Sequence, residues 1–79
     1  MNSTSVKITK YQPRPRIEAW FRRSFKLFGE INDIKLSGSP FHRTHQVVIT
    51  FANSKCAAAA VTAANAGAIG GCRMRAVLV

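Results

Sequence analysis

Four cations stand in short stretches where charged and apolar residues alternate. Lys7 lies in VKITK, Lys35 in NDIKL, and Arg73 and Arg75 in CRMRAV. Successive side chains of a strand point to opposite faces, so this spacing places the cations on the face opposite the apolar residues. The whole chain carries 12 Lys and Arg against three acids, a formal charge of +9. A cationic face on a strongly basic chain favours polyanionic partners, either nucleic acid or anionic lipid.

Catalytic chemistry is not indicated. The three acids, Glu18, Glu30 and Asp33, fall on a predicted helix, its end and a predicted strand, and no nucleophile and base stand at a catalytic spacing. The glycines at 67, 70 and 71 follow a predicted helix and precede a strand, whereas a phosphate-binding loop needs the reverse order. We therefore expect a binding protein and not an enzyme.

The cysteines and histidines also lack the spacing of a known site. Cys56 and Cys72 match no metal knuckle or redox motif, so we interpret them as reduced structural thiols. A zinc site that combines them with His42 and His45 is conceivable, but the spacing is wrong for the usual knuckles. We expect no metal and no cofactor.

The cations are positioned by a set of short strands around Thr44 to Phe51, which reads THQVVITF. Val47, Ile49 and Phe51 alternate with polar or smaller residues, which is typical of a half-buried central strand. Residues 6–10 predict a first strand with Val6 and Ile8 inward. A second strand is predicted with Ile34 and Leu36 inward and Asp33 and Lys35 outward, and the last strand with Met74 and Ala76 inward and Arg73, Arg75 and Val77 outward.

Two amphipathic helices are predicted between these strands. The first should begin near Pro15 and end at Gly29. Its apolar stripe comprises Ile17, Phe21, Phe25 and Phe28, widened by Trp20 and Leu27, with Arg22, Arg23 and Lys26 on the opposite side. The second helix should begin after Asn53 as its N-cap and bury Ala57, Ala60, Val61 and Ala64. The element order is therefore βαββαβ.

Residues 37–45, SGSPFHRTH, predict a polar and partly basic loop. Phe41 has no evident core register, and it stands beside His42, Arg43 and His45. An exposed aromatic ring there would stack on a nucleic-acid base. The alternative is that Phe41 folds back on the edge of the core.

The order and spacing of these elements resemble the RNA recognition motif (RRM) over nearly the whole chain. FKLFGEINDIKL at 25–36 is similar to the stretch of that family that leads into its second strand, and FANSKCAAAAVTAAN at 51–65 is similar to its second helix, including Asn65. IGGCRMRAV at 69–77 resembles the lead into its fourth strand. The resemblance implies one α+β, ferredoxin-like domain over 1–79, with a core of about 5–79. It also implies a four-stranded antiparallel sheet ordered 4-1-3-2 with both helices on one face.

The chain departs from the resembled pattern at the positions that usually stack on RNA bases. The two outward third-strand positions that are usually aromatic fall on Gln46 and Val48, the usual cation falls on Thr44, and the usual first-strand aromatic falls on Lys7. Losing two or three stacking platforms, each contributing about 1–3 kcal/mol, removes much of the usual affinity. The face that remains is polar and cationic.

Two functions are compatible with such a face. The first is an atypical nucleic-acid-binding domain of low sequence specificity that relies on phosphate contacts, with RNA favoured and DNA possible. Its candidate binding residues are Lys7, Thr9, Lys35, Phe41, Arg43, His45, Gln46, Val48, Arg73 and Arg75. The alternative is a protein-interaction or self-association module that does not bind nucleic acid.

The sequence also bears on cellular context. It contains no apolar run long enough to span a membrane, and the N-terminus lacks the apolar core of a signal peptide. We expect an intracellular protein, nuclear in preference to cytoplasmic, without a membrane partner. Because the last predicted strand ends at Val79, we expect a domain excised from a longer protein.

Overall fold

The computed structural model describes residues 3–11, 16–37, 46–69 and 74–79. The elements follow the predicted order βαββαβ, with a short 3-10 turn (η1) after the first helix. They are β1 (Ser5–Thr9), α1 (Ile17–Phe25), η1 (Lys26–Phe28), β2 (Ile31–Ser37), β3 (Gln46–Phe51), α2 (Ser54–Asn65) and β4 (Arg75–Leu78). Pro15, Thr44 and His45, which the sequence placed at element ends, lie outside the described residues.

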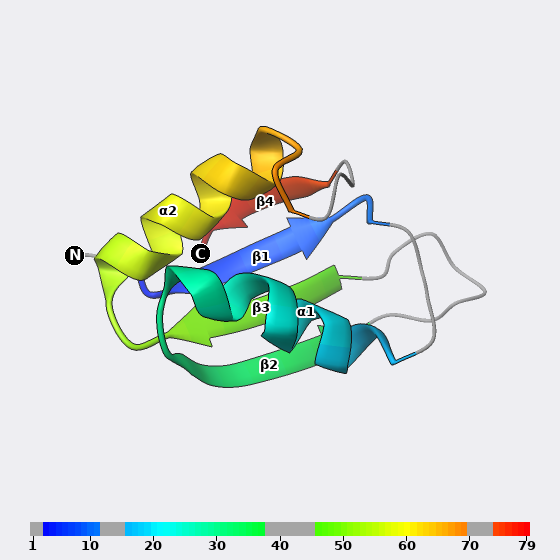
Figure 1. The fold of residues 1–79 in the computed structure, drawn as a ribbon, viewed down its shortest axis with the longest axis horizontal. Coiled ribbons are helices and arrows are strands. Elements are labelled where there is room, and N and C mark those ends of the chain that lie inside the picture. Colours follow the sequence, from blue (N-terminus) through cyan, green and yellow to red (C-terminus); the bar gives the residue numbers. More distant parts are fainter. Residues whose placement is uncertain (1–2, 12–15, 38–45, 70–73) are drawn as a thin grey trace.

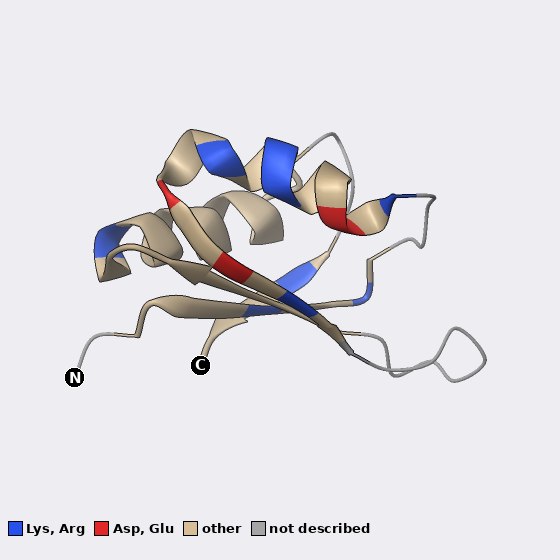
Figure 2. Ribbon diagram, turned by 90° about the horizontal axis from the view of Figure 1, so that it is seen from below, with Lys and Arg blue, Asp and Glu red and all other residues tan. Residues whose placement is uncertain are grey.

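The four strands form one antiparallel sheet in the order β2-β3-β1-β4, which confirms the predicted arrangement. β3 lies inside the sheet and pairs with both β1 and β2, as expected of the central strand. Both helices lie on the same face of the sheet, and over the described residues no helix lies on the other face (Figure 1; Figure 2). The fold thus has one helical layer and one open sheet face.

The core lies between the helices and the sheet. The inward residues of the strands are buried as the alternation predicted, with Val6, Ile8, Val47, Ile49, Phe51 and Ala76 all at most 2% exposed. α1 contributes the rings of Phe21 and Phe25, which stack with centroids 5.8 Å apart. α2 contributes Ala57, Ala60 and Ala64, whose small side chains allow close approach to the sheet.

The stripe on α1 is confirmed except at one position. Ile17, Trp20 and Phe28 pack against the core while partly exposed, but Leu27, expected to widen the stripe, is 88% exposed. The α-helix ends at Phe25 and residues 26–28 form a 3-10 turn. Residues three apart eclipse in such a turn, so Phe25 and Phe28 align on the core side and Leu27 turns outward.

β2 differs from the simple alternation predicted for it. Its register shifts between Ile31, opposite Phe51, and Asp33, opposite Thr50, so the strand has one extra residue there. Ile31 therefore packs against the core while Asp33 stays exposed. Ile34 is buried as expected, but Leu36 is 43% exposed. Leu36 faces the helical side opposite Val47, yet β2 is an edge strand, so Leu36 has a neighbouring strand on one side only.

Two local contacts fix the start of α2 and its packing on the turn after α1. The Asn53 side chain accepts a hydrogen bond of 2.9 Å from the Cys56 N–H, which confirms the predicted N-cap of α2. Gly29 ends η1 with φ 151°, a conformation that L residues rarely adopt. A Cβ at position 29 would overlap the Cys56 sulfur, so only glycine allows α2 to pack this closely on the turn.

Candidate nucleic-acid interface

One row of outward residues crosses all four strands on the open face. Lys35 of β2 lies opposite Val48 of β3, Val48 lies opposite Lys7 of β1, and Lys7 lies opposite Val77 of β4. Lys7 and Val48 each stand between two buried residues, and Lys35 and Val77 each follow a buried residue, so all four point away from the helices. The predicted outward positions of Lys7, Lys35 and Val48 are confirmed.

A third cation stands beside this row. Arg75 of β4 is exposed and lies opposite Thr9 of β1, two residues along the strand from the Lys7–Val77 pair. Diagonal neighbours of this kind are about 7–8 Å apart, so Lys7 and Arg75 are close enough to contact adjacent phosphates. Figure 2 shows the cationic segments on three strands of the sheet. We call Lys7, Lys35 and Arg75 the sheet cations.

The sheet cations are close enough together for their electrostatic potentials to overlap. Lys7 and Lys35 are separated by one strand, which corresponds to about 10 Å. This is close to the screening length of about 8 Å at physiological salt, so the two charges act on the same polyanion and more strongly at low salt. Exposed Asp33, opposite Thr50, places one negative charge on the β2 side of the face.

Polar side chains lie between the charges. Gln46 and Thr50 of β3 and Thr9 of β1 are partly buried on the outward face, as predicted. The Ser5 and Thr50 hydroxyls form a cross-strand hydrogen bond of 3.1 Å between β1 and β3. These groups can donate to phosphate or ribose oxygens, but they offer no ring on which a base could stack.

No aromatic side chain stands at an outward strand position in the described residues. Tyr11, which follows β1, packs edge-on against Phe21 with centroids 5.2 Å apart, and burial raises the pKa of its hydroxyl. Its ring therefore belongs to the packing around α1. The absence of stacking rings from the strands agrees with the sequence prediction at positions 7, 46 and 48.

Four of the predicted site residues fall outside the described parts of the chain. They are Phe41, Arg43 and His45 of the predicted loop and Arg73 before β4. Their predicted contribution to binding stays a prediction. The same holds for three members of the conceivable zinc site, His42, His45 and Cys72, whereas Cys56 is a partly buried free thiol. Over the residues that the structure describes, no three His, Cys, Asp or Glu side chains gather as metal ligands.

Asn65 holds β4 in place, a role that could not be predicted from the sequence. The Asn65 side chain, at the end of α2, donates to the Ala76 carbonyl and accepts from the Ala76 N–H, both at 2.9 Å. β4 is an edge strand, so this amide takes the place of a further strand and fixes the segment that carries Arg75. The resemblance singled out Asn65, but its partner eleven residues away could not be read from the sequence.

The order and pairing of the strands and helices define the class of fold. A four-stranded antiparallel sheet with two helices on one face, in βαββαβ order, is the ferredoxin-like α+β class. Within that class the fold is the one found in RRM domains, as the following solved structures show.

The structural neighbours match over nearly the whole chain at low sequence identity. The RRM of RNA15 aligns with a TM-score of 0.79 and 17% identity, covering 100% of this chain and 92% of that one. RRM3 of Mip6 aligns with a TM-score of 0.80 and 13% identity, covering 98% and 94%. A structure described as the SXL-lethal protein/RNA complex aligns with a TM-score of 0.77 and 14% identity, covering 98% of this chain and 47% of that one. No family model and no curated protein matches the sequence.

Proposed function

We propose that this domain binds single-stranded nucleic acid, RNA in preference to DNA, through phosphate contacts on the open sheet face. The observation that carries the proposal is the row Lys35, Val48, Lys7 and Val77, flanked by Arg75, on the face that no helix covers. The RRM fold supports it, since one solved neighbour is a complex with RNA. The formal charge of +9 supports an anionic partner in general.

Low sequence specificity follows from the types of residue on this face. Phosphate contacts position a nucleic acid without reading its bases. Gln46 can hydrogen-bond one base edge, but Val48 and Lys7 replace rings that would each contribute about 1–3 kcal/mol of stacking. The domain is thus expected to bind many sequences with similar, moderate affinity and to accept single-stranded DNA more weakly.

The test is a titration of labelled single-stranded RNA, single-stranded DNA and duplex DNA at about 50 and 200 mM salt. Three phosphates neutralised by the sheet cations give a slope of log K against log[salt] of about −2, hence an affinity loss of about 20-fold over that range. Replacing Lys7 and Arg75 by Ala should flatten the slope by about 1.4. Arg23→Ala with Arg16→Ala is the matched control, because it removes the same charge from two exposed residues of α1 and its N-cap, away from the sheet cations.

Two further substitutions separate phosphate contact from base reading. Gln46→Ala and Val48→Ala remove outward side chains without changing the charge, so affinity should change little. Binding that is insensitive to salt and selective for sequence would contradict the proposal. So would a double variant of Lys7 and Arg75 that binds with the affinity of the parent protein while Phe41→Ala abolishes binding. Recognition would then lie in loop aromatics.

A second candidate function is self-association through the apolar corner of the same face. Val77 is 44% exposed and Val79 is 54% exposed, and both lie at the β4 edge next to β1. Two such corners could pair across a dimer axis. Sedimentation that depends on protein concentration without nucleic acid, and that Val77→Lys abolishes, would favour this function over the first.

We also propose that the protein is intracellular, that it acts in the nucleus and that it is not an enzyme. These proposals follow from the proposed role in binding nucleic acid inside the cell. In the described portion, no helix is long and apolar enough to cross a membrane. A nuclear location would be tested by imaging the tagged protein.

A further inference from the structure

A groove lies between α1 and the start of β2, away from the row of sheet cations. Its volume is about 540 Å³, and it is lined by Arg22, Lys26, Gly29, Glu30 and Ile31. This is within the range of about 300–1,000 Å³ typical of small-ligand sites. The groove lies where α1 and η1 cross the bulged beginning of β2.

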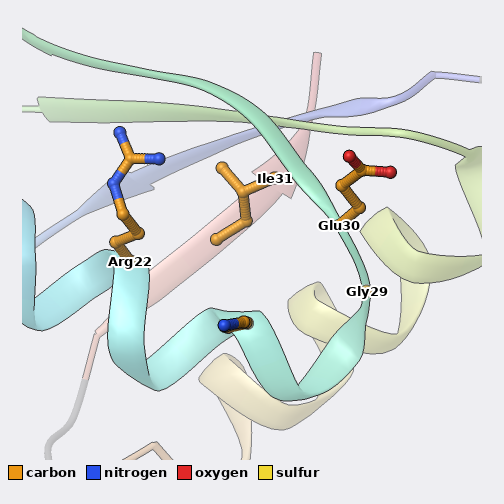
Figure 3. Close-up of a pocket in the computed structure, with 5 residues that line it drawn as sticks. Arg22, Gly29, Glu30 and Ile31 are labelled. Carbon is orange, nitrogen blue, oxygen red and sulfur yellow. The ribbon is translucent and has the colours of Figure 1, made fainter.

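The rim of the groove on α1 is cationic. Arg22 and Lys26 are four residues apart, so they lie on the same side of the helical segment, and both are exposed. Neither makes an ion pair with a carboxylate of the described residues. Figure 3 shows the Arg22 side chain reaching from α1 toward β2 on one side of Ile31 and the Glu30 carboxylate on the other side. The positive end of the groove is therefore not neutralised by its own acid.

The groove also has an apolar side. Ile31 is partly buried and packs against the core because the bulge in β2 turns it toward α1. Gly29 contributes no side chain, so this end of the groove is bordered by backbone. An apolar wall beside two cations favours an occupant with one apolar group and neighbouring negative charges.

We propose that this groove binds an acidic peptide segment that carries one aliphatic or aromatic anchor. The anchor would pack on Ile31, and carboxylates on either side of it would pair with Arg22 and Lys26. A nucleic-acid strand fits less well, because Ile31 offers phosphates no charged or hydrogen-bonding partner, whereas it can pack against an apolar peptide side chain. The groove and the sheet cations are separate surfaces, so the inference does not depend on the proposed function.

The probe is a fluorescein-labelled heptapeptide with a central leucine flanked by three glutamates on each side. About 20 non-hydrogen atoms of the peptide would contact the groove, so the dissociation constant should be on the order of 10–100 µM. Backbone amide NMR shifts of residues 22, 26 and 29–31 should move on titration, while those of residues 7, 35 and 75 should not. A peptide with serine in place of the leucine should bind more weakly if the apolar wall contributes.

Charge reversal gives the decisive comparison. Arg22→Glu with Lys26→Glu should weaken peptide binding at least about tenfold, since each attraction becomes a repulsion. Arg23→Glu with Arg16→Glu is the matched control, because both residues are exposed cations that do not line the groove, and it should retain most of the affinity. Circular dichroism should be used to check that each variant is folded.

Three results would overturn the inference. The first is no shift at residues 22–31 at about ten times the expected dissociation constant. The second is equal weakening by the groove and control pairs, which would mean that only net charge matters. The third is that single-stranded RNA shifts the same groove amides and competes with the peptide, which would assign the groove to the nucleic-acid surface.

Discussion

The hydrogen bonds between Asn65 and Ala76 predict how firmly β4 is held. Asn65→Ala removes a donor and an acceptor and leaves the Ala76 N–H and C=O without those partners at the edge of the sheet. Each bond contributes about 1 kcal/mol to stability. The better helix propensity of alanine offsets up to about 0.6 kcal/mol, less at the last residue of a helix. We therefore expect a net loss of about 1.5–2 kcal/mol.

The assay is thermal and urea unfolding, combined with hydrogen exchange of the β4 amides. A loss of about 2 kcal/mol lowers the melting temperature of a domain of this size by about 8–16 °C. Exchange should accelerate most at residues 76–78, and RNA affinity should fall because Arg75 is less well placed. Thr62→Ala is the control, since the exposed Thr62 hydroxyl donates to the Ala58 carbonyl within α2 and does not contact β4.

Asn65→Asp tests the donor separately. The introduced carboxyl can accept from the Ala76 N–H, but it can donate to the Ala76 carbonyl only when protonated. Its pKa in the folded state should therefore rise above the unfolded value of about 3.9. Its stabilising effect should be complete below the unfolded pKa and be lost as pH rises through the folded pKa. If Asn65→Ala unfolds like the parent, or β4 exchange is unchanged, the amide does not hold the strand.

The remaining predictions concern the core, the turn and the sheet cations. Phe51→Ala should lower the free energy of unfolding by about 3–5 kcal/mol, because Phe51 is buried in the core. Leu27→Ala should change it by less than about 0.5 kcal/mol, because Leu27 is exposed. Equal losses in the two variants would place Leu27 in the core. Gly29→Ala should lower the free energy of unfolding by about 1–3 kcal/mol because of the positive φ at this position. The overlap of the new Cβ with Cys56 should lower it further. In a double-mutant cycle Cys56→Ala should recover only the part of this cost that comes from the sulfur, since the Cβ of residue 56 remains, and full additivity would exclude the contact. Arg75→Ala alone should flatten the salt slope of RNA binding by about 0.7, and an unchanged slope would remove Arg75 from the interface.

The sequence was sufficient for the fold because its local signals agree with the tertiary arrangement. Alternation in β3 placed Val47, Ile49 and Phe51 in the core, and the spacing of Phe21 and Phe25 placed the buried side of α1. The strand order came from the family resemblance and is confirmed by the pairing. Period-2 and helical patterns predict which face a residue occupies, and in one small core that decides burial.

The details that failed depend on geometry that periodicity does not contain. Leu27 continued the apolar pattern, but the change from α to 3-10 helix after Phe25 turned it into solvent. The bulge in β2 moved Ile31 to the helical side, and no residue type at 31–33 marks it. For the same reason the groove beside α1 had no signal in the sequence. The outward positions of Lys7, Lys35 and Arg75 were predicted correctly, while their role in binding awaits the titration.

The packing of Cys56 on Gly29 gives this domain a built-in reporter of slow motion. The sulfur of this partly buried thiol packs where a side chain of residue 29 would be, so separation of α2 from the turn should make it more accessible to a thiol reagent. With Cys72→Ser removing the other thiol, the rate of labelling would rise with the frequency of that separation under native conditions. The same rate, measured with RNA or the acidic peptide bound, would show whether either ligand holds α2 against the turn.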